Sequence, residues 1–156
     1  MIGVEREPRQ LIVAAGLMVA TAVIQTIAVT RLEEFVWMWR DRVSEKISRS
    51  QVMAFVCGVI LYLFALHMGE ISIWAAFYLR TTTYPTFAVA FYESALAFTT
   101  LDVPELPPAW KFLGTAEAIA GLLMFAWSTA LIFSQTGWIS EARRRYLRLG
   151  DPARLD

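Results

Sequence analysis

The stretch from residue 85 to residue 108 constrains the fold of this chain more than any other part of the sequence. It begins with an apolar run of helical character, Thr86 to Phe98, which is shorter than the roughly 20 residues that a helix needs to cross a bilayer. It continues as a polar segment in which three prolines prevent further helix: Pro104, Pro107 and Pro108. Long apolar segments flank the stretch on both sides. Because lipid cannot hydrogen-bond irregular backbone, the pattern predicts a re-entrant loop that is buried in protein or lines water.

The composition indicates a membrane protein. Of the 156 residues, 57% are hydrophobic, the formal net charge is zero and the mean hydropathy is +0.49, whereas a soluble domain is about 45–50% apolar. The length leaves no room for a soluble catalytic or ligand-binding module beside the membrane segments. One histidine and two glutamates in the apolar segments are too few for a catalytic centre. We therefore expect no enzyme activity, no nucleic-acid partner and no cofactor other than inorganic cations.

Three apolar runs are candidates for membrane-spanning helices: Leu11–Thr30, Gln51–Leu79 and Phe112–Phe133. The sequence thus predicts an all-α membrane protein with three transmembrane helices and a re-entrant helix and loop between the last two. A cleavable signal peptide fits the first run poorly, because the run is too long and its flank is not clearly basic. The expected parts of the chain are a first span with a linker (1–50), the two spans around the loop (51–140) and a basic tail (141–156).

Residues 31–50 differ in character from the first span. Their apolar side chains recur at three- and four-residue steps and form one helical stripe: Leu32, Phe35, Val36, Trp39, Val43 and Ile47. Trp37 and Trp39 suit the headgroup layer, so one interpretation is a helix that lies in the membrane surface. The other is a linker helix packed against protein, and the sequence does not decide between them.

The basic residues predict the orientation of the chain. With three spans, the linker and the C-terminal tail lie on the same side of the membrane, and that side carries most of the lysines and arginines. The positive-inside rule places this side in the cytoplasm. We expect a multi-pass protein of the plasma membrane with its N-terminus and the 85–108 stretch outside and its C-terminus in the cytoplasm.

The order of span, polar turret, short helix, Thr-Thr-Leu and span resembles the pore module of potassium channels. Three segments carry the resemblance: HMGEISIWAAFYL (67–79), FYESALAFTTL (91–101) and GLLMFAWSTALIF (121–133). They look like a bacterial branch of that family with one additional N-terminal span, and the resemblance covers residues 51–134. It implies an ion channel of the bacterial inner membrane. Four identical subunits would surround one central axis, with the third span lining the pore and the second span outside it.

The resemblance makes the residues after the short helix the ion selectivity filter: Thr99, Thr100, Leu101, Asp102, Val103, Pro104 and Glu105. Potassium channels continue with Gly-Tyr-Gly-Asp, whose backbone carbonyls replace the water around the ion. This chain has no glycine there, and Pro104 restricts both its own φ and the conformation of Val103. We therefore expect little preference for potassium over sodium. Thr-Leu-Asp also looks like the Thr-Leu-acid filter of voltage-gated sodium and calcium channels.

Asp102 and Glu105 are the candidate cation ligands. In a tetramer, four copies of Asp102 would form a carboxylate ring at the C-terminal ends of the short helices, where the helix dipole adds negative potential. Hard divalent cations prefer oxygen ligands, so we expect such cations to bind there or to block the pore. In the alternative interpretation, Asp102 caps backbone N–H groups of the loop, and Glu105 is a solvated surface group. Glu93 stands where the family usually has an aromatic residue, and its role stays open.

Three ionisable residues lie within the apolar segments: His67, Glu70 and Glu117. Intramembrane ionisable groups suggest function by default. Their similar depth predicts a shared polar cluster behind the short helix, acting as a hydrogen-bonded structural network or, in the sharper alternative, as a metal or proton site. Gly121 in the third span either allows a hinge or lets helices pack closely.

Together these patterns predict a homotetrameric cation channel whose partners are membrane lipids and inorganic cations. The rival is a non-conducting tetrameric scaffold or regulatory subunit with a degenerate pore. The acidity of the loop favours the channel, because a lost pore has no reason to retain both Asp102 and Glu105.

Overall fold

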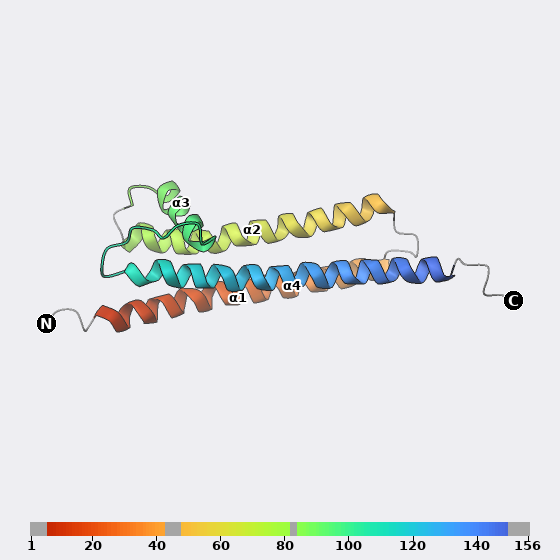
Figure 1. Cartoon of the computed structure of the whole chain (residues 1–156), viewed down its shortest axis with the longest axis horizontal. Coiled ribbons are helices and arrows are strands. Elements are labelled where there is room, and N and C mark those ends of the chain that lie inside the picture. Colours follow the sequence, from red (N-terminus) through yellow and green to blue (C-terminus); the bar gives the residue numbers. More distant parts are fainter. Residues whose placement is uncertain (1–5, 43–47, 82–83, 150–156) are drawn as a thin grey trace.

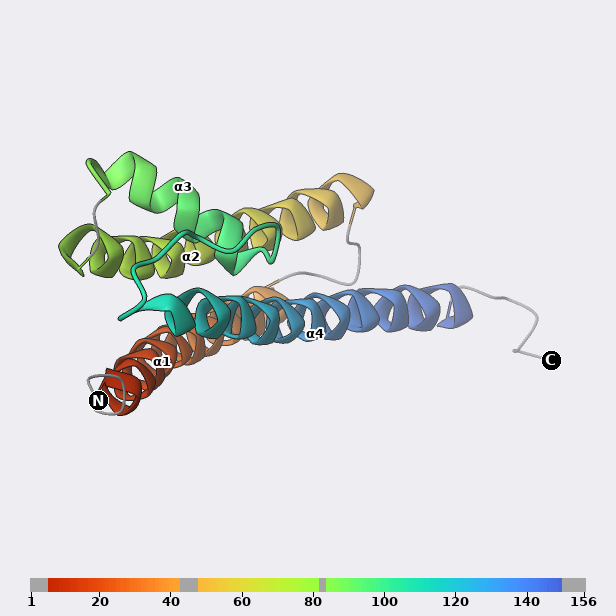
Figure 2. The same cartoon turned by 60° about the vertical axis from the view of Figure 1, so that its left-hand side comes forward.

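The computed structural model of the protein describes residues 6–42, 48–81 and 84–149. These residues form four α-helices: α1 (Arg6–Arg42), α2 (Arg49–Thr81), α3 (Phe87–Phe98) and α4 (Lys111–Leu149). The long helices α1, α2 and α4 form a bundle, and the short α3 lies against α2 and α4 near one end of it (Figure 1, Figure 2). The described residues contain no β-strand, so the all-α expectation is confirmed for them.

Three of the helices are long and apolar enough to cross a membrane: Pro8–Trp39, Ser50–Thr81 and Lys111–Gly137. Large apolar side chains on all three are exposed in the single chain, including Ile12, Leu61 and Phe133, which are 72%, 66% and 72% exposed. Outward-facing apolar side chains are stable in lipid or against a partner chain, but not in water. The chain is therefore a membrane-embedded protein, and each of the three predicted apolar runs lies in a helix that is long enough to span a membrane.

The expectation of a separate linker helix after residue 30 is wrong. α1 runs without interruption through this region to Arg42, and residues 43–47 lie outside the described part. No glycine or proline lies between Gly16 and Arg42 to end the helix, and the charged residues at 31–34 are good helix formers. Leu32 and Val36 are buried in one apolar cluster whose other members come from α1, α2 and α4: Val29, Val59, Leu63 and Leu131. Leu32 and Val36 thus pack against protein, as in the second interpretation, but in a continuation of the first span. Phe35 of the same stripe is 54% exposed, and Val43 and Ile47 lie outside the described residues.

α4 is also longer than the third apolar run. It continues past Phe133 to Leu149 and crosses the expected boundary between residues 140 and 141. Between Phe133 and Leu149 the sequence has no proline and only one glycine, Gly137, so nothing forces the helix to stop where the hydrophobicity ends. The first part of the predicted tail is therefore a helical extension of α4.

α3 packs closely because the surfaces around it are made of small side chains. The cluster at this end of the bundle contains four buried alanines from α2, α3 and α4: Ala75, Ala90, Ala116 and Ala120. Small residues let helix backbones approach each other, which is how helices associate in membranes. Trp74, Tyr78 and Leu113 are also fully buried in this end of the molecule. This packing holds α3 and the loop after it in place.

Candidate functional site

The candidate site is the loop of residues 99–110 (the 99–110 loop) between α3 and α4. α3 begins at the N-cap residue Thr86, whose hydroxyl oxygen accepts the Val89 N–H, and ends at Phe98. Its start lies near the C-terminal end of α2, and α3 runs back along α2 toward the middle of the bundle (Figure 1). The 99–110 loop then returns to the N-terminus of α4 at the end of the bundle from which α3 started. The expected helix within residues 86–98 is thus present, and the segment leaves and rejoins the bundle at one end.

α3 ends in a Schellman motif that uses the first candidate filter residues. The Thr100 N–H donates to Ala97 O (2.9 Å) and the Leu101 N–H to Leu96 O (2.9 Å), the two hydrogen bonds that define this motif. Thr100 has a φ of 60° in the left-handed region, where glycine is the usual residue. A β-branched residue in this conformation is strained by about 1–2 kcal/mol. The carbonyls of Ala95, Leu96 and Ala97 at the end of α3 are therefore satisfied within the chain, and Thr100 carries the backbone strain.

Two glycines of α4 fix the loop against the bundle. A Cβ atom on Gly121 would lie 1.9 Å from Phe98 O, so only glycine allows the end of α3 to approach α4 this closely. A Cβ atom on Gly114 would lie 3.0 Å from the Pro104 ring, and Pro104 is buried. α4 is helical throughout this region. Gly121 was expected either to allow a hinge or to let helices pack closely, and the structure shows close packing.

The candidate filter residues other than Pro104 are exposed in the single chain. They are Thr99, Thr100, Leu101, Asp102, Val103 and Glu105. Asp102 Oδ1 accepts the N–H of Val103 at 2.7 Å, which is the capping contact of the alternative interpretation. The Asp102 side chain is exposed all the same. Capping of the loop and contact with a cation are therefore compatible at this residue.

The electrostatics near the loop are negative. Burial raises the pKa of the Tyr84 hydroxyl to about 12, and the negative charges of Glu93, Glu105 and Glu117 act in the same direction. Each of these carboxylates opposes the negative tyrosinate. Glu93 and Glu105 therefore add negative electrostatic potential at Tyr84, which lies shortly before α3.

Glu117 joins three helices through its side chain. The Tyr78 hydroxyl on α2 donates to Glu117 Oε2 at 2.5 Å, and the Ser94 hydroxyl on α3 lies in hydrogen-bond contact with Glu117 Oε1. Ser94 Oγ is also 3.0 Å from Ile71 O on α2. One hydroxyl hydrogen cannot donate to both acceptors at once, but Ile71 O lies within α2 and already accepts an N–H of its own helix, so the Ser94 hydroxyl is free to donate to Glu117.

His67 and Glu70 belong to a second network. His67 Nδ1 is 2.8 Å from Glu70 Oε2, and His67 Nε2 is 3.1 Å from the Ser128 hydroxyl on α4. Gln25 on α1 donates from Nε2 to the same hydroxyl at 3.0 Å. All four side chains are buried. A chain of polar groups therefore links the three long helices.

The predicted shared cluster is thus divided into two neighbouring networks. No hydrogen bond between described residues joins Glu117 to His67 or Glu70. Ser94, a partner of Glu117, also contacts the carbonyl of Ile71, which directly follows Glu70 in the sequence. Four members of these networks were not predicted from the sequence: Gln25, Tyr78, Ser94 and Ser128. Their signal was available, because polar side chains within apolar segments commonly hydrogen-bond between helices in a membrane.

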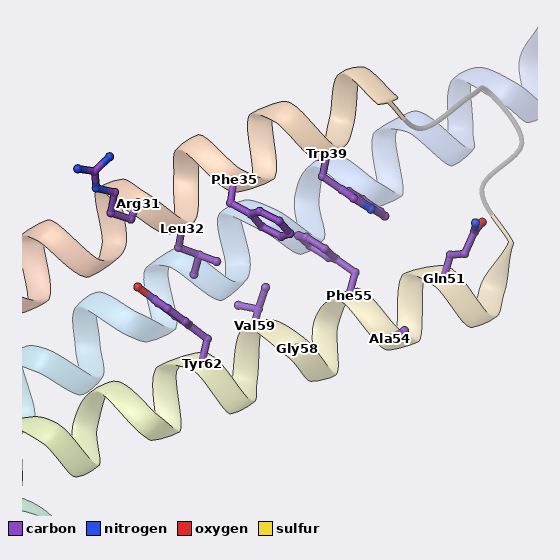
Figure 3. A pocket seen from close by; sticks show the side chains of 10 residues that line it. All are labelled: Arg31, Leu32, Phe35, Trp39, Gln51, Ala54, Phe55, Gly58, Val59 and Tyr62. Carbon is purple, nitrogen blue, oxygen red and sulfur yellow. The ribbon is translucent and has the colours of Figure 1, made fainter.

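A cavity of about 530 Å³ lies between α1 and α2, away from α3 and the 99–110 loop (Figure 3). Its walls are mainly apolar and aromatic, and the stacked rings of Trp39 and Phe55, with centroids 4.5 Å apart, stand beside it. Arg31 lies at its edge and pairs with Glu34 at 3.2 Å. The cavity shares no residue with the candidate filter or with the two buried networks.

The described residues contain no group of three or more histidine, cysteine, aspartate or glutamate side chains placed to hold a metal ion. Comparison of the chain with protein-family models, with characterised proteins and with solved structures finds no match.

Proposed function

We propose that this protein is the subunit of a homotetrameric cation channel. The observation that carries the proposal is the short helix α3, which ends at Phe98 and delivers an exposed polar loop between two long apolar helices. Irregular backbone at membrane depth is tolerated only where it is buried in protein or lines water. Four such loops around one axis meet this condition, and the potassium-channel-like sequence segments suggest that number.

Apolar exposure supports an assembly. Leu101 and Val103 are 75% and 58% exposed in the single chain, although both lie in the loop that the packing on α4 holds in place. On the exposed face of α4, Ile119, Leu122 and Leu123 are also about half exposed. Neighbouring subunits would cover such surfaces in a tetramer.

The same loop supports weak discrimination between potassium and sodium. No residue from Thr99 to Glu105 is a glycine, and the one left-handed residue, Thr100, ends α3. The loop thus does not form the stack of inward-pointing carbonyls that potassium channels use. Asp102, repeated four times, would attract cations through its carboxylate and bind divalent ions more strongly than monovalent ones.

One observation favours a second candidate, a non-conducting scaffold. The Asp102 carboxylate accepts the Val103 N–H, so a structural role for Asp102 needs no ion. In that case the acidic loop would stabilise the assembly without forming a pathway.

The test is the reversal potential of the purified protein in planar bilayers with opposed gradients of potassium, sodium and calcium. We expect a cation current with potassium and sodium permeabilities of similar size. Strong potassium selectivity would overturn the filter assignment. Absence of current from folded tetramers under every gradient would favour the scaffold.

The proposed topology has its own test. We propose that the N-terminus faces the outside and the C-terminus the cytoplasm of a bacterial inner membrane. A cysteine introduced at Ser140, in a chain with Cys57 replaced by serine, should react with a membrane-impermeant maleimide only after the membrane is opened. Labelling of intact cells, or a dimer as the largest crosslinked species, would contradict the proposal.

A further inference from the structure

α4 has no capping residue of its own at its N-terminus. The residues before Lys111 are Pro107, Pro108, Ala109 and Trp110, and none of them is a serine, threonine, aspartate or asparagine. The first N–H groups of a helix have no acceptor within the helix. A donor without an acceptor is costly where water is excluded, so a partner from elsewhere in the chain would stabilise the start of α4.

The partner comes from α1, 102 residues away in the sequence. The Phe112 N–H donates to Gln10 Oε1 at 3.2 Å, and Gln10 Nε2 lies 3.5 Å from Pro108 O. Gln10 is only 9% exposed. One carboxamide thus contacts both the first turn of α4 and the last part of the 99–110 loop.

A ring contact strengthens this connection. The guanidinium carbon of Arg9 lies 5.5 Å from the centroid of the Trp110 ring, within the range of a cation–π interaction. Trp110 in turn packs edge-on against Phe77 of α2, with ring centroids 5.4 Å apart. The N-terminal turn of α1 therefore holds the junction between the loop and α4 from two adjacent positions.

The junction also determines where the candidate filter lies. Gly114, two residues after Phe112, is the residue against which Pro104 packs. Pro104 lies two residues after Asp102 in the same loop. A shift of the first turn of α4 would move the Pro104 contact and, with it, the acidic residue.

We infer that Gln10 is a positioning residue of the filter: it caps α4 from α1 and so fixes the loop that carries Asp102. The inference rests on the proposed function for its effect on ions, whereas the capping contact can be measured without any current. α1 contributes no residue to the loop itself, but through Gln10 this helix takes part in holding the loop in place.

The test compares two substitutions of Gln10 in the full-length protein. Gln10→Leu removes both polar atoms at similar volume. Gln10→Glu retains an oxygen that accepts the Phe112 N–H, and its charge is favourable at a helix N-terminus. Thr30→Val is the matched control on α1, because the Thr30 hydroxyl contacts only the carbonyl of Thr26 in its own helix.

Amide hydrogen exchange measures the cap directly. Gln10→Leu should accelerate exchange of the Phe112 amide by about five- to tenfold, as expected for the loss of one hydrogen bond. The Leu101 and Asp102 amides, which donate to Leu96 O, should also exchange faster, whereas amides in the middle of α2 should not. Gln10→Glu should leave the Phe112 amide protected, because it keeps the acceptor, and Thr30→Val should leave both the Phe112 and the loop amides unchanged.

The permeability ratio of sodium to calcium supplies the functional readout. Gln10→Leu should change this ratio more than Gln10→Glu, which keeps the contact with Phe112, and Thr30→Val should leave the ratio unchanged. Unchanged exchange at Phe112 in Gln10→Leu would overturn the cap. Faster exchange at Phe112 with unchanged loop amides would overturn the positioning role. If no form of the protein conducts, the proposed function fails, and the exchange of the loop amides still decides whether Gln10 positions the loop.

Discussion

The hydroxyl of Tyr78 on α2 donates a hydrogen bond to the carboxyl group of Glu117 on α4, with 2.5 Å between the oxygen atoms. Both side chains are fully buried, and the other carboxyl oxygen contacts Ser94 on α3. One carboxyl group therefore joins the short helix to both of the long helices that hold it. The arrangement accounts for a glutamate in an otherwise apolar span without requiring a bound ion.

The first prediction tests the hydrogen bonds of Glu117. Glu117→Gln should retain thermal stability, because the amide NH₂ can donate to Ser94 while the amide oxygen accepts from Tyr78. Glu117→Ala should lower the free energy of unfolding by about 1–3 kcal/mol for each buried polar partner that it leaves unmatched. Thermal unfolding of the purified variants in detergent measures both. Equal destabilisation by the two substitutions would contradict the hydrogen-bond assignment.

The second prediction concerns the close approach of α3 and α4. Gly121→Ala would place a Cβ atom within 1.9 Å of Phe98 O, so the helices would have to separate. We expect a loss of about 3 kcal/mol or more, at the upper end of overpacking effects. Gly69→Ala is the matched control, since no atom lies within 4 Å of its added Cβ. Gly69→Ala should gain up to about 1 kcal/mol of stability through helix propensity. Such a gain, together with a loss of stability in Gly121→Ala, would support the packing role of Gly121. A fully stable Gly121→Ala protein would exclude it.

The third prediction is a pH dependence at Tyr84. Burial and the nearby carboxylates raise the pKa of its hydroxyl to about 12, above the usual value of about 10. The folded protein holds this proton more tightly than the unfolded chain does. The contribution of Tyr84 to stability is thus fully present below pH 10 and is lost as the pH rises toward 12.

Ultraviolet titration of tyrosinate formation measures this pKa. The difference between the native protein and Tyr84→Phe should show a midpoint near pH 12. Glu93→Gln should lower the midpoint, because it removes the negative charge that opposes the tyrosinate. A midpoint near the usual tyrosine value in the native protein would refute the proposed environment.

The fourth prediction concerns the acidic loop. Asp102→Asn should weaken block of the monovalent current by calcium and reduce selectivity for cations over anions, because four carboxylates near one axis repel one another and gain from a bound divalent ion. Glu105→Gln should have a smaller effect, since Glu105 lies farther along the loop. Current–voltage curves at increasing calcium concentration compare the two variants. An Asp102→Asn channel with unchanged block and lower stability would indicate that Asp102 only caps the Val103 N–H.

Much of the fold could be predicted from local sequence. Three long apolar runs specify three spans because only helices satisfy the backbone within lipid, and Thr86 and the prolines after Phe98 bound the short helix between them. The ends of the helices were less predictable. α1 continues through Arg31 and Glu34, because a loss of hydrophobicity does not end a helix unless the backbone is also interrupted.

The buried networks show where the sequence alone was insufficient. Periodicity and depth indicated that Glu70 and Glu117 lie at similar levels, but not that they bond to different partners. Which hydroxyl reaches which carboxyl depends on the rotation of each helix about its axis, and packing against the other helices sets that rotation.

The sequence by itself determined that this chain is a helical membrane protein with three spans, a short apolar helix and an acidic, glycine-free loop, because hydrophobicity and backbone chemistry are local properties. Only the tertiary structure decided that Gly121 admits the carbonyl of Phe98, that Glu117 bonds to Tyr78, and that Gln10 caps α4. Each of these contacts joins residues more than 20 positions apart, and their geometry arises from helix packing that no local pattern encodes.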